Sequence, residues 1–115
     1  MAETPRFMQG VYQFEGKGLD KPLPPQSKIA YTVPGDKRVR PIYVRAGNSS
    51  AEMVCLVLTS NGDPIRYCPI GAKSGIDVGL HVIEERGPGT ALEVLVAAPE
   101  GVKGTVVIDV GLMEA

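Results

Sequence analysis

Cys55 and Cys68 are the only thiols in the 115-residue chain, and they bound the segment CLVLTSNGDPIRYC. Asn61-Gly62 between them is the strongest two-residue signal for a type I′ hairpin turn. With that turn as the centre, Cys55 lies opposite Cys68 in a non-hydrogen-bonded pair, with Cα atoms about 4.5 Å apart. A disulfide accepts that separation. The sequence therefore predicts that the two thiols meet across a hairpin.

Two prolines agree with this register. Pro64 falls in a non-hydrogen-bonded pair, where its missing N–H costs no ladder bond, and Pro69 ends the ladder. The cysteines then share a mixed outer face. The opposite, core face is predicted to hold five side chains: Val54, Leu56, Leu58, Ile65 and Tyr67.

The redox state of the pair stays open at this point. The thiols can pack as two small apolar groups, form a bridge after release to an oxidising environment, or bond to a neighbouring subunit. A bridge would contribute roughly 3 kcal/mol in the chain-entropy model. In a reducing cytosol it would stay open.

Other groups that could do chemistry are few. His81 is the single histidine, and no Cys-x-x-Cys occurs, so the sequence predicts no metal site and no cofactor. Asp77 shares the expected polar face of His81, but four strand residues span about 13 Å. A nucleophile pair of Cys68 and His81 has no supporting local signature. We therefore predict no catalytic residues and a protein that is not an enzyme.

Two further patterns are rejected. GAKSG at 71–75 has the wrong order for a phosphate loop, and a strand follows it where that motif needs a helix. Glu84 and Glu85 are adjacent, so in a strand they point to opposite faces and cannot share an acid–base role.

The segment KRVRPIYVR interleaves basic residues with Tyr43, as a groove for single-stranded nucleic acid does. The pI of about 5.8 argues against nucleic acid as a partner. Pro41 instead indicates an edge strand or a bulge, and charges on an edge resist aggregation. The predicted basic edge consists of Lys37, Arg38, Arg40 and Arg45.

Alternation of apolar and polar residues with period two runs through most of the chain, which contains 14 Gly and 10 Pro. Strands with Gly/Pro turns at such spacing predict an all-β fold, an antiparallel β-sandwich or small barrel of about seven to eight strands. The last three strands, near 76–82, 92–96 and 106–112, are expected to form a meander.

Residues 1–28 differ in composition, because GKGLDKPLPPQSK is rich in Gly, Pro and Lys. We expect an extended N-terminal arm at 1–28 and a single β-sandwich domain at 29–115. The arm carries an apolar patch that needs burial on the domain or on another subunit. Its members are Phe7, Val11, Tyr12 and Phe14.

The chain shows neither a secretory signal pattern nor an apolar run long enough for a membrane span. We expect synthesis in the cytoplasm and no membrane partner. The net charge of −1 hides an asymmetry: residues 1–50 carry +4 and residues 51–115 carry −5. Such a bipolar chain could associate with itself, although folding could equally interleave the two charges.

Taken together, these features predict a non-enzymatic structural protein, most concretely a capsid decoration (cement) protein of a virus or phage. It would form a homo-oligomer, a trimer being one form, and bind a capsid shell at the virion surface through its arm and sheet faces. The alternative is a small-ligand or carbohydrate-binding module that uses the loops 45–51, 71–75 and 85–90. The absence of Trp, and of any aromatic residue in those loops, ranks it second.

Overall fold

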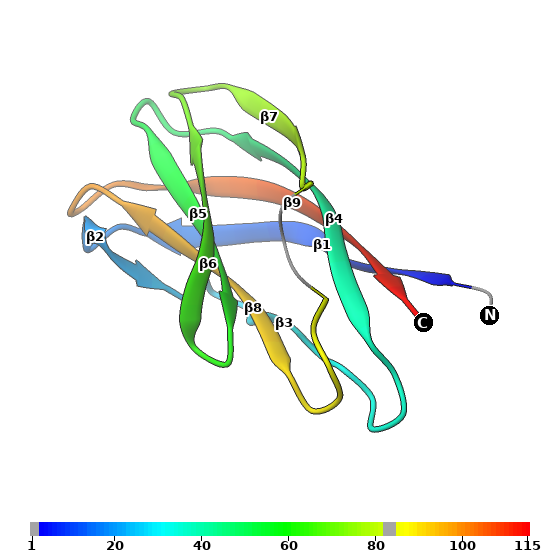
Figure 1. Ribbon diagram of the computed structural model, residues 1–115. Coiled ribbons are helices and arrows are strands. Elements are labelled where there is room, and N and C mark those ends of the chain that lie inside the picture. Colours follow the sequence, from blue (N-terminus) through cyan, green and yellow to red (C-terminus); the bar gives the residue numbers. More distant parts are fainter. Residues whose placement is uncertain (1–2, 82–84) are drawn as a thin grey trace.

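The computed structural model describes residues 3–81 and 85–115, which form two antiparallel sheets packed face to face (Figure 1). The predicted all-β sandwich is confirmed, and the described residues contain nine strands. The molecule measures 45 × 23 × 22 Å along its principal axes. In the described part of the chain, no helix has the length and apolar character to cross a membrane.

Each sheet mixes strands from distant parts of the sequence. The first sheet has the order β1 (Thr4–Glu15), β9 (Lys103–Glu114), β4 (Val39–Asn48) and β7 (Gly75–Gly79). The second has the order β2 (Gly18–Leu23), β8 (Ala91–Ala98), β5 (Val54–Ser60) and β6 (Asp63–Ile70), with β3 (Ile29–Thr32) also paired to β8.

The expected meander of the last three strands is wrong. β7 pairs with β4, β8 pairs with β5, and β9 lies between β1 and β4. Alternation tells which side chains of a strand face the core, but it holds no information about the neighbouring strand. Val82 and Glu84, which the sequence analysis also considered, lie outside the described residues.

The N-terminal segment is part of the sandwich, which corrects the arm at 1–28. All twelve residues of β1 pair with β9, and β2 pairs with β8 (Figure 1). The four residues of the predicted apolar patch therefore lie on two different faces of β1. Phe14 is buried in the core and Tyr12 packs against it, whereas Phe7 and Val11 lie on the outer face. Composition does not distinguish a free arm from this segment, because the Gly/Pro-rich stretch contains the short strand β2 and the connections between β1, β2 and β3.

The Asn61-Gly62 turn is confirmed, with φ of 51° and 87° at its two residues. The register beyond it differs, however. Thr59 still opposes Pro64, but Leu58 opposes Arg66, so Ile65 is an extra residue in β6. This is a β-bulge, which shifts the pairing by one residue.

That one-residue shift determines where the two cysteine side chains lie. Leu56 opposes Cys68 and Cys55 opposes Pro69. Cys68 therefore joins the core, Cys55 lies half-buried on the other face of the hairpin, and both are free thiols. The predicted pairing of Cys55 with Cys68 is wrong, because a register shift of one residue turns every later side chain of the strand to the opposite face. Tyr67, expected in the core, is 63% exposed by the same shift.

β4 contains the predicted bulge, between Pro41 and Tyr43, but it is not an edge strand because β9 and β7 flank it. The three arginines of the predicted basic edge are paired with carboxylates at the surface. Arg38 contacts Glu85 at 2.7 Å, and Lys37 precedes it in the turn. The other two ion pairs are Arg40–Glu3 at 3.1 Å and Arg45–Asp77 at 3.3 Å.

Glu114 joins the two sheets near the C-terminus. It is almost fully buried, accepts a hydrogen bond from the Tyr31 hydroxyl of β3, and contacts the Arg6 guanidinium of β1 at 3.3 Å. The hydrogen bond from Tyr31, followed by Arg6, lowers the pKa of the Glu114 carboxyl, and burial with the same hydrogen bond raises the pKa of the Tyr31 phenol.

Tyr31→Phe should therefore destabilise the protein in a pH-dependent way. A carboxyl whose pKa is lowered by folding stabilises above its ordinary pKa of about 4.3, and this stabilisation is lost as pH falls through the folded value. We expect the difference in unfolding free energy between the parent and Tyr31→Phe to be largest near pH 7 and to shrink below about pH 4. Urea unfolding across this range measures it. Tyr67→Phe is the control, and a difference that is constant with pH contradicts this role of Tyr31.

Candidate functional site

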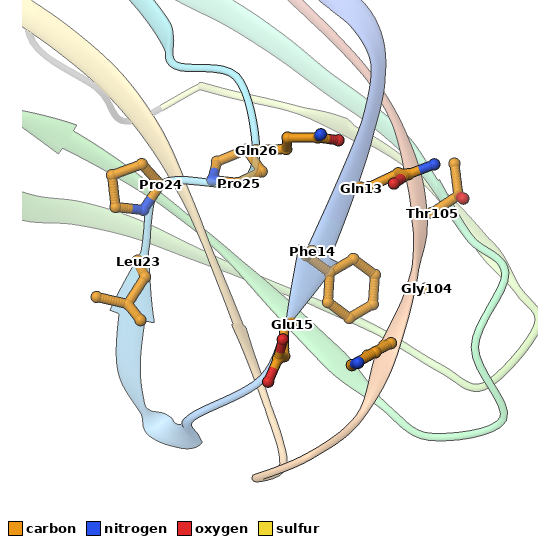
Figure 2. A pocket seen from close by; sticks show the side chains of 10 residues that line it. Gln13, Phe14, Glu15, Leu23, Pro24, Pro25, Gln26, Gly104 and Thr105 are labelled. Carbon is orange, nitrogen blue, oxygen red and sulfur yellow. The ribbon is translucent and has the colours of Figure 1, made fainter.

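A groove of about 610 Å³ lies along the edge of the sandwich that contains β1 and β2 (Figure 2). One wall is the proline-containing segment of residues 23–26, which we call the strap. The other wall is formed by the ends of β1 and β9. We call this cavity the strap groove. It is lined by Gln13, Phe14, Glu15, Leu23, Pro24, Pro25, Gln26, Lys103, Gly104 and Thr105.

Local structure holds both walls in place. The backbone N–H of Gln26 donates to the carbonyl of Gln13 at 2.9 Å, which ties the strap to β1. Pro24 and Pro25 restrict φ, so the strap has few alternative conformations. Strand pairing places Gln13 opposite Thr105 and Phe14 opposite Gly104.

Glycine at position 104 makes room for the aromatic ring in the groove. A Cβ there would lie 3.1 Å from Cζ of Phe14 and 3.1 Å from Cβ of Ser50. The Phe14 ring therefore lies close to the β9 backbone, and its remaining exposed part is 7% of the residue. The Phe14 ring and the two strap prolines, Pro24 and Pro25, are apolar parts of the groove lining.

The polar groups of the groove are mostly uncharged. Figure 2 shows Gln26 extending from the strap toward β1, with Gln13 and Thr105 together beyond it. Amide and hydroxyl side chains both donate and accept hydrogen bonds. Such a lining suits a neutral ligand with many hydroxyl groups and some apolar surface.

The two charged residues of the groove oppose each other across the strands. Glu15 pairs in register with Lys103, and its carboxylate contacts the Lys17 ammonium at 3.1 Å. The hydrogen bond from Lys17 lowers the pKa of Glu15, so this carboxyl is ionised at neutral pH. Glu15 is the single carboxylate among the lining residues.

Two of the three loops named in the sequence analysis meet. Asn48 is 4% exposed, and its amide nitrogen donates to the carbonyls of Glu52 and Gly71 at 2.8 and 3.1 Å. Its side-chain oxygen accepts bonds from the backbone N–H and the hydroxyl of Ser50, both at 2.9 Å. The segments 48–53 and 71–75 are thus fixed together at one end of β4.

The third loop, at 85–90, lies at the other end of β4. There the backbone N–H of Arg86 donates to the carbonyl of Val39 at 2.7 Å. The three loops therefore do not form one surface, and a ligand site built from all of them is wrong. Because the chain reverses direction at each strand, the spacing of loops along the sequence does not give the end of the sandwich where each one lies.

The remaining candidate groups do not form a reactive centre. Cys68 and His81 line a second, smaller cavity. Burial raises the pKa of both cysteine thiols, so they are protonated and poorly nucleophilic at neutral pH. His81 is exposed, as its predicted place on a polar face implied. Within residues 3–81 and 85–115, no three His, Cys, Asp or Glu side chains gather to hold a metal ion.

Comparison with solved structures supports the fold. The CBM36-1 domain of a multidomain xylanase from the hindgut metagenome of Trinervitermes trinervoides is similar over 97% of this chain and 96% of that chain. The TM-score is 0.61 and the sequence identity is 14%, so the likeness concerns the β-sandwich alone. No protein-family model matches the chain, and comparison with curated proteins finds no similar sequence.

Sequence reasoning did not find the strap groove. The available signal was PLPPQ at 22–26, which we interpreted as part of a free arm. A groove could be expected only once β1 and β2 were placed on the edges of two facing sheets, because its lining combines residues 13–26 with residues of β9 that follow about eighty positions later in the sequence.

Proposed function

We propose that this protein is a non-catalytic carbohydrate-binding domain whose ligand lies in the strap groove. The observation that supports it most directly is the lining of that groove. Two amide side chains, a hydroxyl, a phenylalanine ring and two prolines all line it, together with a single carboxylate. The similar solved domain comes from a xylanase and has a name of the carbohydrate-binding module type, which adds weak support.

The chemistry of sugars fits these groups. A pyranose presents hydroxyls around its rim and C–H groups on its faces. Hydroxyls bind to Gln13, Gln26 and Thr105, and the C–H faces lie against Pro24 and Pro25. Ligand sites generally combine an apolar lining with a few placed polar groups that fix orientation. The groove is open at the surface, which favours a chain of sugars over a single enclosed one.

The capsid decoration protein stays an untested prediction, as does a homo-oligomer. The decoration protein was expected to bind the capsid shell through its N-terminal arm and sheet faces. Since the described part of that arm lies in β1 and β2, a decoration protein would need another contact surface.

Isothermal titration of the full chain with xylan, followed by other soluble polysaccharides, tests the proposal. The double variant Gln13→Ala with Gln26→Ala should weaken binding by about tenfold to a hundredfold, because each lost hydrogen bond is worth about 0.5–1.5 kcal/mol. The hydrogen bond from the backbone N–H of residue 26 to the backbone carbonyl of residue 13 does not involve either side chain, so the groove should keep its shape.

Gln9→Ala is the matched control. Gln9 is an exposed glutamine on the same face of β1 and is not among the groove residues. Its substitution should leave the affinity unchanged. The proposal is overturned if no polysaccharide binds, or if Gln9→Ala and the double variant lower the affinity equally.

A further inference from the structure

A second cavity, of about 250 Å³, lies between β6 and β7, on the side of the sandwich opposite to the strap groove. We call it the β6–β7 pocket. It opens where the outermost strands of the two sheets face each other. The side chains that matter for its chemistry are Arg66, Cys68, Ile76, Val78, Leu80 and His81.

The apolar wall of this pocket follows from the register of β7. Ile76 opposes Ala46 and Val78 opposes Val44, and both partners belong to the core. Ile76 and Val78 therefore face inward, toward the second sheet. Val78 is nevertheless 37% exposed, because the sandwich is open at this edge.

The bulge at Ile65 provides the opposite wall. Without it, Arg66 and Cys68 would project from the outer face of the second sheet. With it, Arg66 opposes Leu58 and Cys68 opposes Leu56, so both turn toward the first sheet. Bulges are often found beside binding sites, where they redirect a side chain. Here the bulge points an arginine into an apolar pocket.

No salt bridge or side-chain hydrogen bond of Arg66 occurs among the residues that the structure describes. Its Nε is buried and makes no hydrogen bond to any of the described residues. Among those residues, none that lines the pocket carries a carboxylate, and Asp77 is engaged with Arg45 on the outer face. A buried donor on a cation without an acceptor is unfavourable, so an anion would bind here with a charge-assisted hydrogen bond.

We propose that the β6–β7 pocket binds a small monocarboxylic acid with an apolar body. The carboxylate accepts hydrogen bonds from the Arg66 guanidinium, and the hydrocarbon part lies against Ile76, Val78 and Leu80. The imidazole of His81, which lies against the backbone of Gly79, can donate a further bond at the entrance. This site is independent of the strap groove and takes a different chemical class of ligand.

Titration calorimetry with the linear acids from butanoate to octanoate tests the proposal on the full chain. Affinity should rise about fourfold for each added methylene until the pocket is filled, because each buried methylene gains about the same transfer free energy. The matching alcohols should bind at least about tenfold more weakly than the acids. Equal affinities for the acids and the alcohols would mean that Arg66 does not recognise the carboxylate, which would overturn the proposal.

Arg66→Met keeps the length of the side chain and removes its charge. It should weaken octanoate binding by about tenfold or more, whereas Arg45→Met, on the outer face, should have no effect. Val78→Asp provides a second variant at a partly exposed position. Its carboxylate would repel the ligand and should abolish binding, with folding of each variant checked by circular dichroism. Unchanged affinity in both Arg66→Met and Val78→Asp, or no binding of any acid to the parent, contradicts the site.

The experiment also separates this proposal from the carbohydrate site. The double variant Gln13→Ala with Gln26→Ala should bind octanoate like the parent, and Arg66→Met should bind polysaccharide like the parent. Amide chemical shifts of Val78 and Leu80 should move on addition of octanoate, while those of Gln13 and Thr105 should not. Movement confined to the strap groove would place the acid there and overturn the assignment.

Discussion

Phe14→Ala is expected to lower the free energy of unfolding by about 3–5 kcal/mol, the usual cost of truncating a buried phenylalanine. Phe14 is 7% exposed and packs in the core beside Gly104. Because small domains are stable by only about 5–15 kcal/mol, the loss should appear as a much lower midpoint in urea. Equilibrium unfolding followed by circular dichroism measures it.

Phe7→Ala is the matched control, since the chain has two phenylalanines and both lie in β1. The Phe7 ring is 51% exposed on the outer face, so its removal should cost less than about 1 kcal/mol. A free N-terminal arm predicts the opposite pattern, in which neither substitution changes the stability of the domain. Equal small effects would therefore support the arm and contradict the paired strand β1.

Asn48→Asp is expected to destabilise the protein by about 3 kcal/mol, although it changes one atom type. Asn48 donates from its amide nitrogen to two backbone carbonyls, of Glu52 and Gly71. Aspartate has no such donor, so both carbonyls would lose a partner and face a buried carboxylate instead. Each unsatisfied buried group costs about 1–3 kcal/mol. Thermal and urea unfolding at neutral pH measure the loss.

Asn61→Asp is the corresponding control in the hairpin turn. Asn61 uses its side-chain oxygen to accept a bond from the N–H of Ala91 at 2.9 Å, and aspartate keeps that acceptor. Aspartate also tolerates the positive φ of this position. Its effect should stay within about 0.5 kcal/mol. If Asn61→Asp is as destabilising as Asn48→Asp, the amide donors of Asn48 are not what joins its two loops.

The two proposed ligand sites lie on opposite edges of one sandwich, and both exist because the sheets do not close there. At one edge the strap covers the ends of β1 and β9, and at the other β6 and β7 stand apart. Open edges leave room for side chains such as Gln26 and Arg66 to face a cavity. The two proposed ligands would therefore occupy separate edges of the domain.

The sequence by itself determined the class of fold and several local features. Period-two alternation identified the strands of residues 92–96 and 106–112, since the side chains of a strand alternate between core and solvent whatever its neighbours are. Asn61-Gly62 gave the hairpin turn, because it accommodates positive φ at both positions. Pro41 marked a bulge, because proline cannot donate to a ladder. Each of these signals depends on a few adjacent residues.

The tertiary structure decided everything that depends on contacts between distant residues. A single extra residue, Ile65, moved Cys68 into the core and separated it from Cys55, and no local rule places such a bulge. Pairing with β9 made residues 4–15 a strand of the sheet, although the composition that follows them resembles a linker. The strap groove and the β6–β7 pocket arise in the same way. The strap groove combines residues 13–26 with residues 103–105, and the β6–β7 pocket lies between consecutive strands that belong to different sheets, so only the packing of the two sheets forms these cavities.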